Sequence, residues 1–134
     1  RDLARSAPFV QKQVTQLPSK VRFISAQFLA LLDDDLWLKN AAHANAMATH
    51  LYEQTVGLPG VALDGAPEVN SIFPILPVSN IEALRDWSFF YDWDSHHQQV
   101  RWMTAWDVSG DDVTQFASGV AAALDSPDSP TRPA

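Results

Sequence analysis

The chain has 134 residues, of which 46% are hydrophobic, and it contains no cysteine. This length accommodates one compact domain, and the absence of cysteine excludes disulfides, thiolate metal sites and cysteine nucleophiles. The formal net charge of -7 argues against general nucleic-acid binding, which needs clustered Lys and Arg. No apolar run approaches the roughly 20 residues of a membrane helix, so we do not expect a membrane as partner. The acidic charge makes nucleic acid an unexpected partner as well.

The chain begins with Arg1 rather than Met, so we expect either a processed product or a piece of a longer protein. Residues 1–16 are polar and mixed, and we interpret them as an arm or short helix that continues from an earlier segment, with Pro8 as a break. Apolar residues at helical spacing then predict a helix over 18–32, which Pro18 suits in its first turn.

A second helix is predicted after three successive aspartates, with Asp34 or Asp35 as its cap. The helix should end near Val56, because Gly57 and Pro59 follow closely. Its apolar stripe consists of Trp37, Ala41, Ala44, Ala48 and Leu51.

The remaining chain alternates strands with short helices. The predicted strands are 61–63, 71–76, 88–93 and 99–106, and the predicted helices are a short one from Ser79 and a last one over 110–124. Pro74 cannot donate to a ladder, so the second strand should be bulged or at an edge. Ser109 and Asp112 approximate a capping box for the last helix. The proline-rich segment 125–134 is predicted to be disordered.

Together these elements predict a two-layer α+β domain over 17–124, with an antiparallel sheet of about 3–4 strands covered by helices on one face. In the strand 99–106, Val100, Trp102, Thr104 and Trp106 share one face, which places Arg101 on the other. A guanidinium there has two interpretations. It is a planar fork for a carboxylate, or it is an exposed arginine paired with Asp92, Asp94 or Asp107.

Other chemistry finds little support in the sequence. The four histidines lack the spacing of a metal site, because His43 and His50 are two helical turns apart and His96 and His97 are adjacent. There is no nucleophile elbow and no glycine-rich phosphate loop. None of the three lysines sits in an apolar setting that favours Schiff-base chemistry. As an isolated chain, the sequence has the pattern of a non-enzyme.

Several collinear segments resemble the threonine aldolase and β-eliminating lyase family. They are QLPSKVRF (16–23), AQ (26–27), LWL (36–38), HANAMA (43–48), NSIF (70–73), FYDW (90–93) and VRWMTAWD (100–107). They are spread over most of residues 9–120, and each alone is a weak motif. The family has a large pyridoxal-phosphate domain followed by a small α+β domain of fold type I, and the chain corresponds to the small domain.

The resemblance implies a lyase that cleaves threonine-like β-hydroxy amino acids in the cytoplasm as a homodimer or homotetramer. It implies that Arg101 binds the α-carboxylate of the substrate. It also implies that Arg22 binds the cofactor near the phosphate of pyridoxal phosphate or lies at the subunit boundary, and that Lys12 is a cofactor-binding lysine close to it. Without these matches Arg22 is a surface charge. The family's Gly-Gly-Thr-Lys type motif is absent, so we expect the Schiff-base lysine upstream of Arg1 and the chain alone to be inactive.

Two alternatives remain open at this point. The same fold supports β-elimination or transamination, because the residues that choose the reaction belong to the large domain. A different class of function is a free-standing α+β protein-interaction module without catalysis, whose apolar helices and five tryptophans bind a partner.

Overall fold

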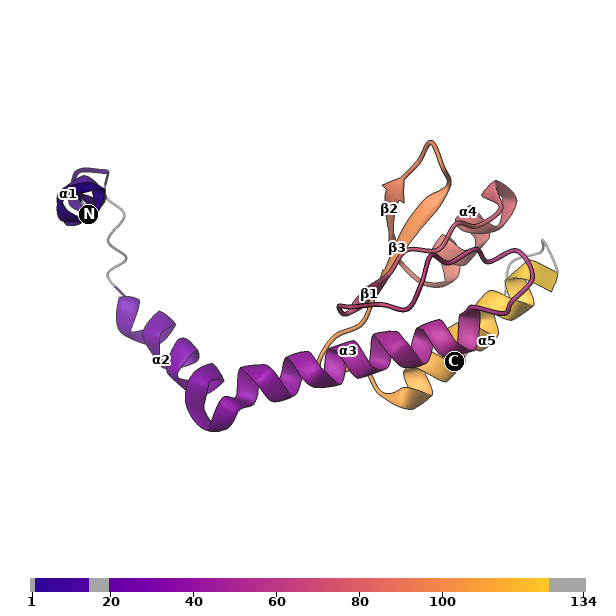
Figure 1. Cartoon of the computed structure of the whole chain (residues 1–134), viewed down its shortest axis with the longest axis horizontal. Coiled ribbons are helices and arrows are strands. Elements are labelled where there is room, and N and C mark those ends of the chain that lie inside the picture. The colour runs from indigo at the N-terminus through magenta and orange to yellow at the C-terminus, as the bar shows by residue number, and fades with distance from the viewer. Residues whose placement is uncertain (1, 15–19, 126–134) are drawn as a thin grey trace. The chain divides into compact units, whose positions relative to one another are not determined.

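The computed structural model describes residues 2–14 and 20–125 (Figure 1). The chain divides into two compact units, Arg1–Trp37 and Leu38–Ala134. No helix within the described ranges combines the length and apolar character that crossing a bilayer requires.

The first unit is helical in its described part. Its elements are α1 (Asp2–Gln13), α2 (Val21–Leu32) and the 3-10 turn η1 (Asp33–Asp35). Pro8, expected to break the chain, lies inside α1 instead. The expected helix over 18–32 begins at Val21 among the described residues. The predicted domain boundary at 16/17 lies outside them, as does the predicted tail beyond Asp125, so both stay predictions.

Helix α2 is apolar but buries none of its residues. Phe28 is 62% exposed and Leu29 is 69% exposed, and the other large apolar side chains of the helix are exposed too. These others are Val21, Phe23, Ile24, Leu31 and Leu32. An apolar helix of this kind normally packs against another surface.

The junction between α2 and α3 (Leu36–Thr55) uses left-handed backbone. Asp34 and Asp35 have φ angles of 48° and 56°. Asp and Asn adopt this region more readily than other non-glycine residues. Asp35, directly before α3, therefore lacks the extended backbone of a typical N-cap, in contrast to the capping role predicted for it.

The core of the second unit lies between its helices and its sheet. Helix α3 buries Ala44, Ala48 and Leu51, three members of the predicted stripe, whereas Trp37 is 50% exposed. Helix α5 (Gly110–Asp125) buries small and branched side chains at helical spacing. They are Val113, Ala117, Val120 and Ala123. The alternation of small and larger residues lets these elements approach closely around one cluster.

Helix α4 (Val78–Trp87) packs against α5 through aromatic side chains. Trp87 stacks on Phe116, with ring centroids 5.6 Å apart. A Cβ atom at Gly119 would lie 2.2 Å from the Trp87 ring, so the contact requires glycine there. The N-cap of α4 is Pro77 rather than the predicted Ser79, and no side chain caps this end.

The sheet of the described chain is antiparallel, with strand order β1-β3-β2. The strands are β1 (Ser71–Ile72), β2 (Tyr91–Asp94) and β3 (Gln99–Met103). Val100 and Trp102 are buried beneath it, and the Trp102 ring meets the Phe116 ring edge-on at 5.0 Å. The predicted α+β class, with a small antiparallel sheet, is therefore confirmed. Figure 1 shows α3 and α5 running beneath this sheet.

Strand lengths differ from prediction. The segment 61–63 contributes only a bridge between Ala62 and Ile75, and β1 stops at Ile72. Pro74 has no N–H to donate, although its carbonyl oxygen accepts from Val100 N at 2.9 Å. β1 lies at the sheet edge, as predicted for the segment 71–76 that contains Pro74. The last predicted strand also ends early, because β3 stops at Met103.

Candidate functional site

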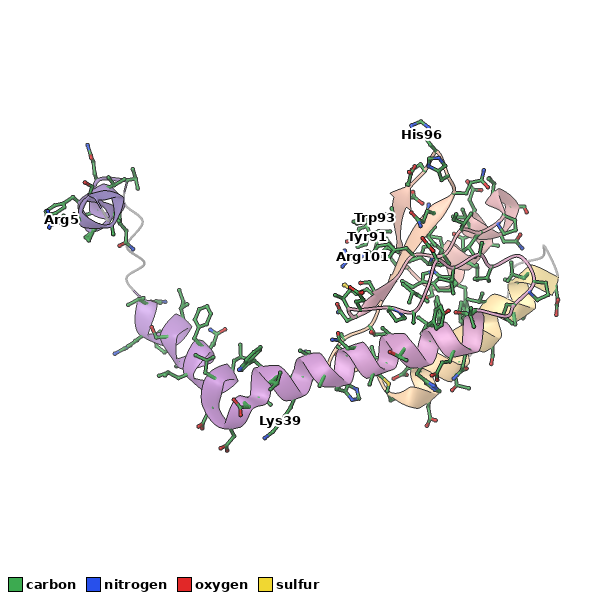
Figure 2. The ribbon with its side chains drawn as sticks, viewed as in Figure 1. Arg5, Lys39, Tyr91, Trp93, His96 and Arg101 are labelled. Atoms are coloured by element: carbon green, nitrogen blue, oxygen red, sulfur yellow. The ribbon has the colours of Figure 1, made fainter. Side chains whose placement is uncertain are left out.

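A row of side chains crosses the outer face of the sheet. Tyr91 is the cross-strand partner of Arg101, and Ser71 is the partner of Met103. Cross-strand partners and alternate residues of one strand share a face, so these four residues line one side of the sheet. Figure 2 shows Tyr91 and Arg101 projecting from the same side as Trp93.

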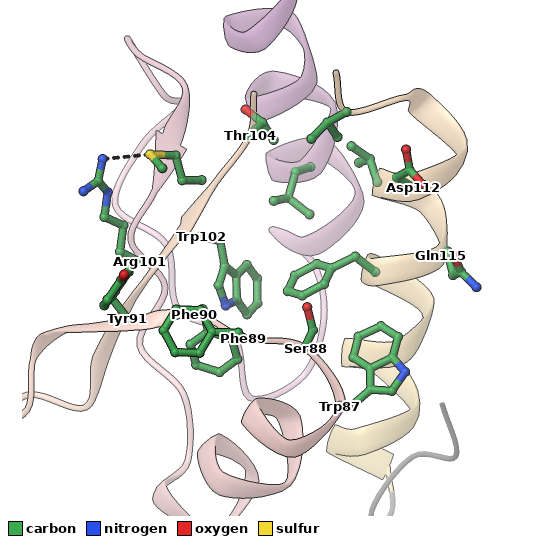
Figure 3. Close-up of a pocket in the computed structure, with 15 residues that line it drawn as sticks. Trp87, Ser88, Phe89, Phe90, Tyr91, Arg101, Trp102, Thr104, Asp112 and Gln115 are labelled. Atoms are coloured by element: carbon green, nitrogen blue, oxygen red, sulfur yellow. Dashed lines mark hydrogen bonds between the residues drawn. The ribbon is translucent and has the colours of Figure 1, made fainter. Parts of the chain in front are cut away.

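Arg101 is held within this row by two hydrogen bonds. Its Nε donates to Ser71 Oγ at 3.3 Å, and its Nη2 donates to Met103 Sδ at 3.0 Å. Figure 3 shows the guanidinium on one side of β3 and the Trp102 ring on the other. The predicted alternation is therefore correct over the strand itself, where Arg101 is half-buried and Trp102 is buried.

The carboxylates proposed as alternative partners of Arg101 are engaged elsewhere or stand apart. Asp92 accepts a hydrogen bond from Arg85 at 2.5 Å, and Asp94 pairs with His97 at 2.7 Å. Arg101 makes no ion pair with Asp107 or with any other acidic residue in the described part of the chain. The guanidinium thus retains donors for an anionic group from outside this part of the chain.

Tyr91, the cross-strand partner of Arg101, is one of several exposed aromatic residues along the same segment of the chain. Phe89, Tyr91 and Trp93 are 72%, 64% and 59% exposed. Phe89 meets Tyr91 at 4.9 Å, and Phe73 meets Trp93 at 4.8 Å, so the rings form two contacting pairs. Groups of exposed large aromatic side chains are typical of surfaces that bind a partner.

A cleft of about 560 Å³ opens beside this face and is also lined by Arg101 and Tyr91. Phe116 and Trp102 also line it, and Figure 3 shows the Trp102 ring on the side of β3 that is opposite the guanidinium. The indole Nε1 of Trp102 is buried without a hydrogen-bond partner among the described residues. The lining of the cleft combines aromatic and aliphatic side chains with the polar residues Ser88, Arg101, Thr104, Asp112 and Gln115.

Asp112, on the rim of the cleft, is committed to capping α5. Its Oδ2 accepts from Ser109 Oγ at 2.6 Å and from Ser109 N at 2.8 Å, while its own N–H donates to Ser109 Oγ at 3.2 Å. The predicted capping box is thus present. The side-chain hydrogen bond from Ser109, followed by the backbone one, lowers the pKa of Asp112 below its ordinary value.

Three of the histidines make polar contacts with other residues of the described chain. His43 Nε2 lies 2.7 Å from the carbonyl oxygen of Val108, and His50 Nε2 lies 2.8 Å from Gln54 Nε2. The side-chain hydrogen bond from His97 lowers the pKa of Asp94, with further backbone donors from the same turn. Across residues 2–14 and 20–125, no three His, Asp or Glu side chains gather in a metal-binding arrangement.

The other two predicted site residues belong to the first unit. Lys12 lies in the last turn of α1, and Arg22 lies in the first turn of α2 with its guanidinium 4.9 Å from the Phe23 ring centroid. Both are exposed, and neither forms an ion pair within the described ranges. Their proposed contact with a cofactor stays a prediction.

Two neighbours of Arg101 were not predicted as site residues. Strand register makes Tyr91, ten positions away, the cross-strand partner of Arg101. It pairs Ser71 with Met103, which brings the Ser71 hydroxyl within reach of Arg101, 30 positions away. The alternation of polar and apolar residues along each strand was the one signal that pointed toward them. That pattern assigns faces but does not say which residues are opposite each other.

The chain is similar to two curated proteins, each named low specificity L-threonine aldolase. It is 36% identical to that of a Pseudomonas species over 92% of its length, and 38% identical to that of Pseudomonas aeruginosa over 90%. The chain spans 36% and 35% of the length of these relatives. The resemblance predicted from the sequence motifs is confirmed.

A solved structure of Leishmania major threonine aldolase matches with a TM-score of 0.62 and 25% identity. The match includes 73% of this chain and 29% of that one. No protein-family model matches the chain.

Proposed function

We propose that this chain, which is similar to low-specificity L-threonine aldolases, is the C-terminal portion of a pyridoxal-phosphate-dependent lyase. The enzyme cleaves β-hydroxy amino acids, converting threonine to glycine and acetaldehyde. The main support for this proposal comes from Arg101. Its guanidinium has no acidic partner among the described residues and lies on a sheet face with exposed aromatic side chains. The similarity to the aldolases supports the choice of substrate class.

In this proposal Arg101 grips the α-carboxylate of the substrate. A planar fork donates parallel hydrogen bonds to the two carboxylate oxygens, which fixes the orientation of the acid as well as its position. Holding the carboxylate restricts rotation about the bond to Cα. The Cα–Cβ bond is thereby kept in the orientation in which it breaks, which is a positioning effect.

In this proposal the chain contributes cationic side chains to the binding of the cofactor, but not the lysine that forms the Schiff base. Lys12 and Arg22 are exposed cations without ion-pair partners in the described ranges, as a contact to a phosphate requires. Lys20 and Lys39 are exposed as well, so no described lysine lies in an apolar pocket. We therefore assign the Schiff-base lysine to another segment of the protein. Pyridoxal phosphate, when bound, takes up the electrons released as the Cα–Cβ bond breaks.

The exposed aromatic side chains of the sheet support the proposal that this face packs against a larger domain. Burial of Phe89, Tyr91 and Trp93 against the pyridoxal-phosphate domain of the same protein would remove apolar surface from water and surround Arg101 with a low-dielectric environment. A cation in such surroundings binds a carboxylate more strongly than one in water. Assembly into a homodimer or homotetramer and a cytoplasmic location belong to the same proposal.

The exposed apolar helix α2 and the aromatic face also favour a second function, a non-catalytic protein-interaction module. The DNA upstream of the codon for Arg1 separates the two. An open reading frame that encodes a lysine motif and a large α/β domain supports the enzyme. A start codon next to Arg1 supports the module.

The activity itself is tested on the protein that this longer reading frame encodes. We expect it to show the absorbance of bound pyridoxal phosphate and to release glycine and acetaldehyde from threonine, while the 134-residue chain alone does neither. Production of a 2-oxo acid instead would indicate β-elimination or transamination. A full-length protein that binds no cofactor and leaves threonine intact would contradict the proposal.

A further inference from the structure

We propose that Ser71 is a positioning residue that aims the guanidinium of Arg101, an inference that rests on the proposed function of Arg101. Ser71 does not touch the substrate in this proposal. Its hydroxyl group holds Nε, so that the two terminal nitrogens of the guanidinium face the incoming carboxylate.

The placement of Ser71 suits an anchor. The residue is 3% exposed, although it is polar and belongs to an edge strand. The preceding residue, Asn70, connects the start of β1 to Thr104, which directly follows β3. Asn70 Nδ2 donates to Thr104 O at 2.7 Å, and Thr104 N donates to Asn70 O at 3.0 Å. A short side chain on such a fixed backbone has little freedom to move.

The two contacts of Arg101 differ in strength. The Nε contact to Ser71 Oγ has a hydroxyl acceptor, whereas the Nη2 contact to Met103 Sδ has a thioether, which is a weak acceptor. Met103 is also 57% exposed. A carboxylate therefore displaces the sulfur contact easily, while the serine contact remains in place.

This geometry selects one edge of the guanidinium. A carboxylate can bind an arginine through Nε and one terminal nitrogen, or through both terminal nitrogens. Because Ser71 occupies Nε, the substrate is left with Nη1 and Nη2. Ser71 thus fixes the direction from which the α-carboxylate is approached, and with it the torsion that Arg101 controls.

The test compares Ser71→Ala with Ser118→Ala in the full-length protein. We expect Ser71→Ala to raise KM for threonine and to lower kcat, so that kcat/KM falls about fivefold to tenfold, the effect of one lost hydrogen bond. Ser118→Ala removes a serine hydroxyl that donates to Thr114 O at 2.8 Å on α5, outside the residues that line the cleft, so its KM should stay close to wild type. Ser71→Cys retains a weak acceptor and should give a KM between those of the wild type and Ser71→Ala. This variant provides the test if Ser71→Ala fails to fold.

A second measurement separates aiming from general structural damage. Threoninol has an alcohol in place of the carboxylate, so its inhibition constant should not change in Ser71→Ala. Equal weakening of threonine and threoninol, or an unchanged KM for threonine in both Ser71 variants, would overturn the role of Ser71. If Arg101→Ala also leaves KM for threonine unchanged, the proposed function of Arg101 fails as well.

Discussion

At the scale of single residues, Asp112 links a capping contact to pH. Its carboxylate accepts two hydrogen bonds from Ser109, which lower its pKa below the ordinary value of 3.8. A carboxyl group whose pKa is lower in the folded state stabilises the fold above its unfolded pKa. This contribution is lost as the pH falls through the lowered folded value.

We therefore expect Asp112→Asn to lower the Tm by a few degrees at neutral pH and by less in acid, as measured by thermal unfolding between about pH 2 and pH 7. Asp111→Asn is the matched control, because Asp111 lies in the same first turn without this capping bond. Equal losses of Tm at both ends of the pH range would show that ionisation of Asp112 does not contribute.

At the scale of elements, the contact between α4 and α5 depends on Gly119. Alanine is favoured over glycine inside a helix by about 1 kcal/mol, so propensity alone predicts that Gly119→Ala stabilises α5. The structure predicts the opposite sign, because the new Cβ would lie 2.2 Å from the ring of Trp87. Trp87 would have to leave its stacked position on Phe116.

Chemical denaturation measures the difference. We expect Gly119→Ala to reduce the free energy of unfolding by about 1–3 kcal/mol, as overpacking usually does. Gly110→Ala is the control, since a Cβ added at Gly110 meets no atom within 4 Å and the change should be neutral or slightly stabilising. A Gly119→Ala protein as stable as the control would contradict the close packing described here.

Comparison of the predicted and observed elements shows which sequence patterns were sufficient to predict a helix or a strand. The last helix and its capping box follow from local pattern, and α5 starts at Gly110 as predicted. The strands were harder, because a short segment such as 71–76 is apolar nearly throughout and only pairing decides where the ladder ends. The position of Arg101 on the outer face followed from alternation, whereas its contact with Ser71 required the register.

At the scale of the whole molecule, the isolated chain exposes much apolar surface. No residue of α2 is buried, and the aromatic residues Phe89, Tyr91 and Trp93 are exposed too. The α+β class was predictable from the order of elements. What covers these surfaces was not, because a sequence pattern marks an apolar face without identifying its partner.

We expect the 134-residue chain to self-associate in analytical ultracentrifugation at micromolar concentration. The double variant Phe28→Ser, Leu29→Ser should reduce this association, because it removes the two most exposed large apolar side chains of α2. Gln27→Ala on the same helix is the control. A chain that sediments as a monomer would contradict the view that α2 is an interface.

Arg101 is proposed to hold the carboxylate of an amino acid, and steady-state kinetics of Arg101→Ala are the decisive test of this role. In the full-length protein we predict that KM for threonine rises on the order of a hundredfold, the loss expected for charge-assisted hydrogen bonds. Arg85→Ala is the control, because Arg85 already pairs with Asp92. An Arg101→Ala protein with unchanged kcat/KM would contradict the claim.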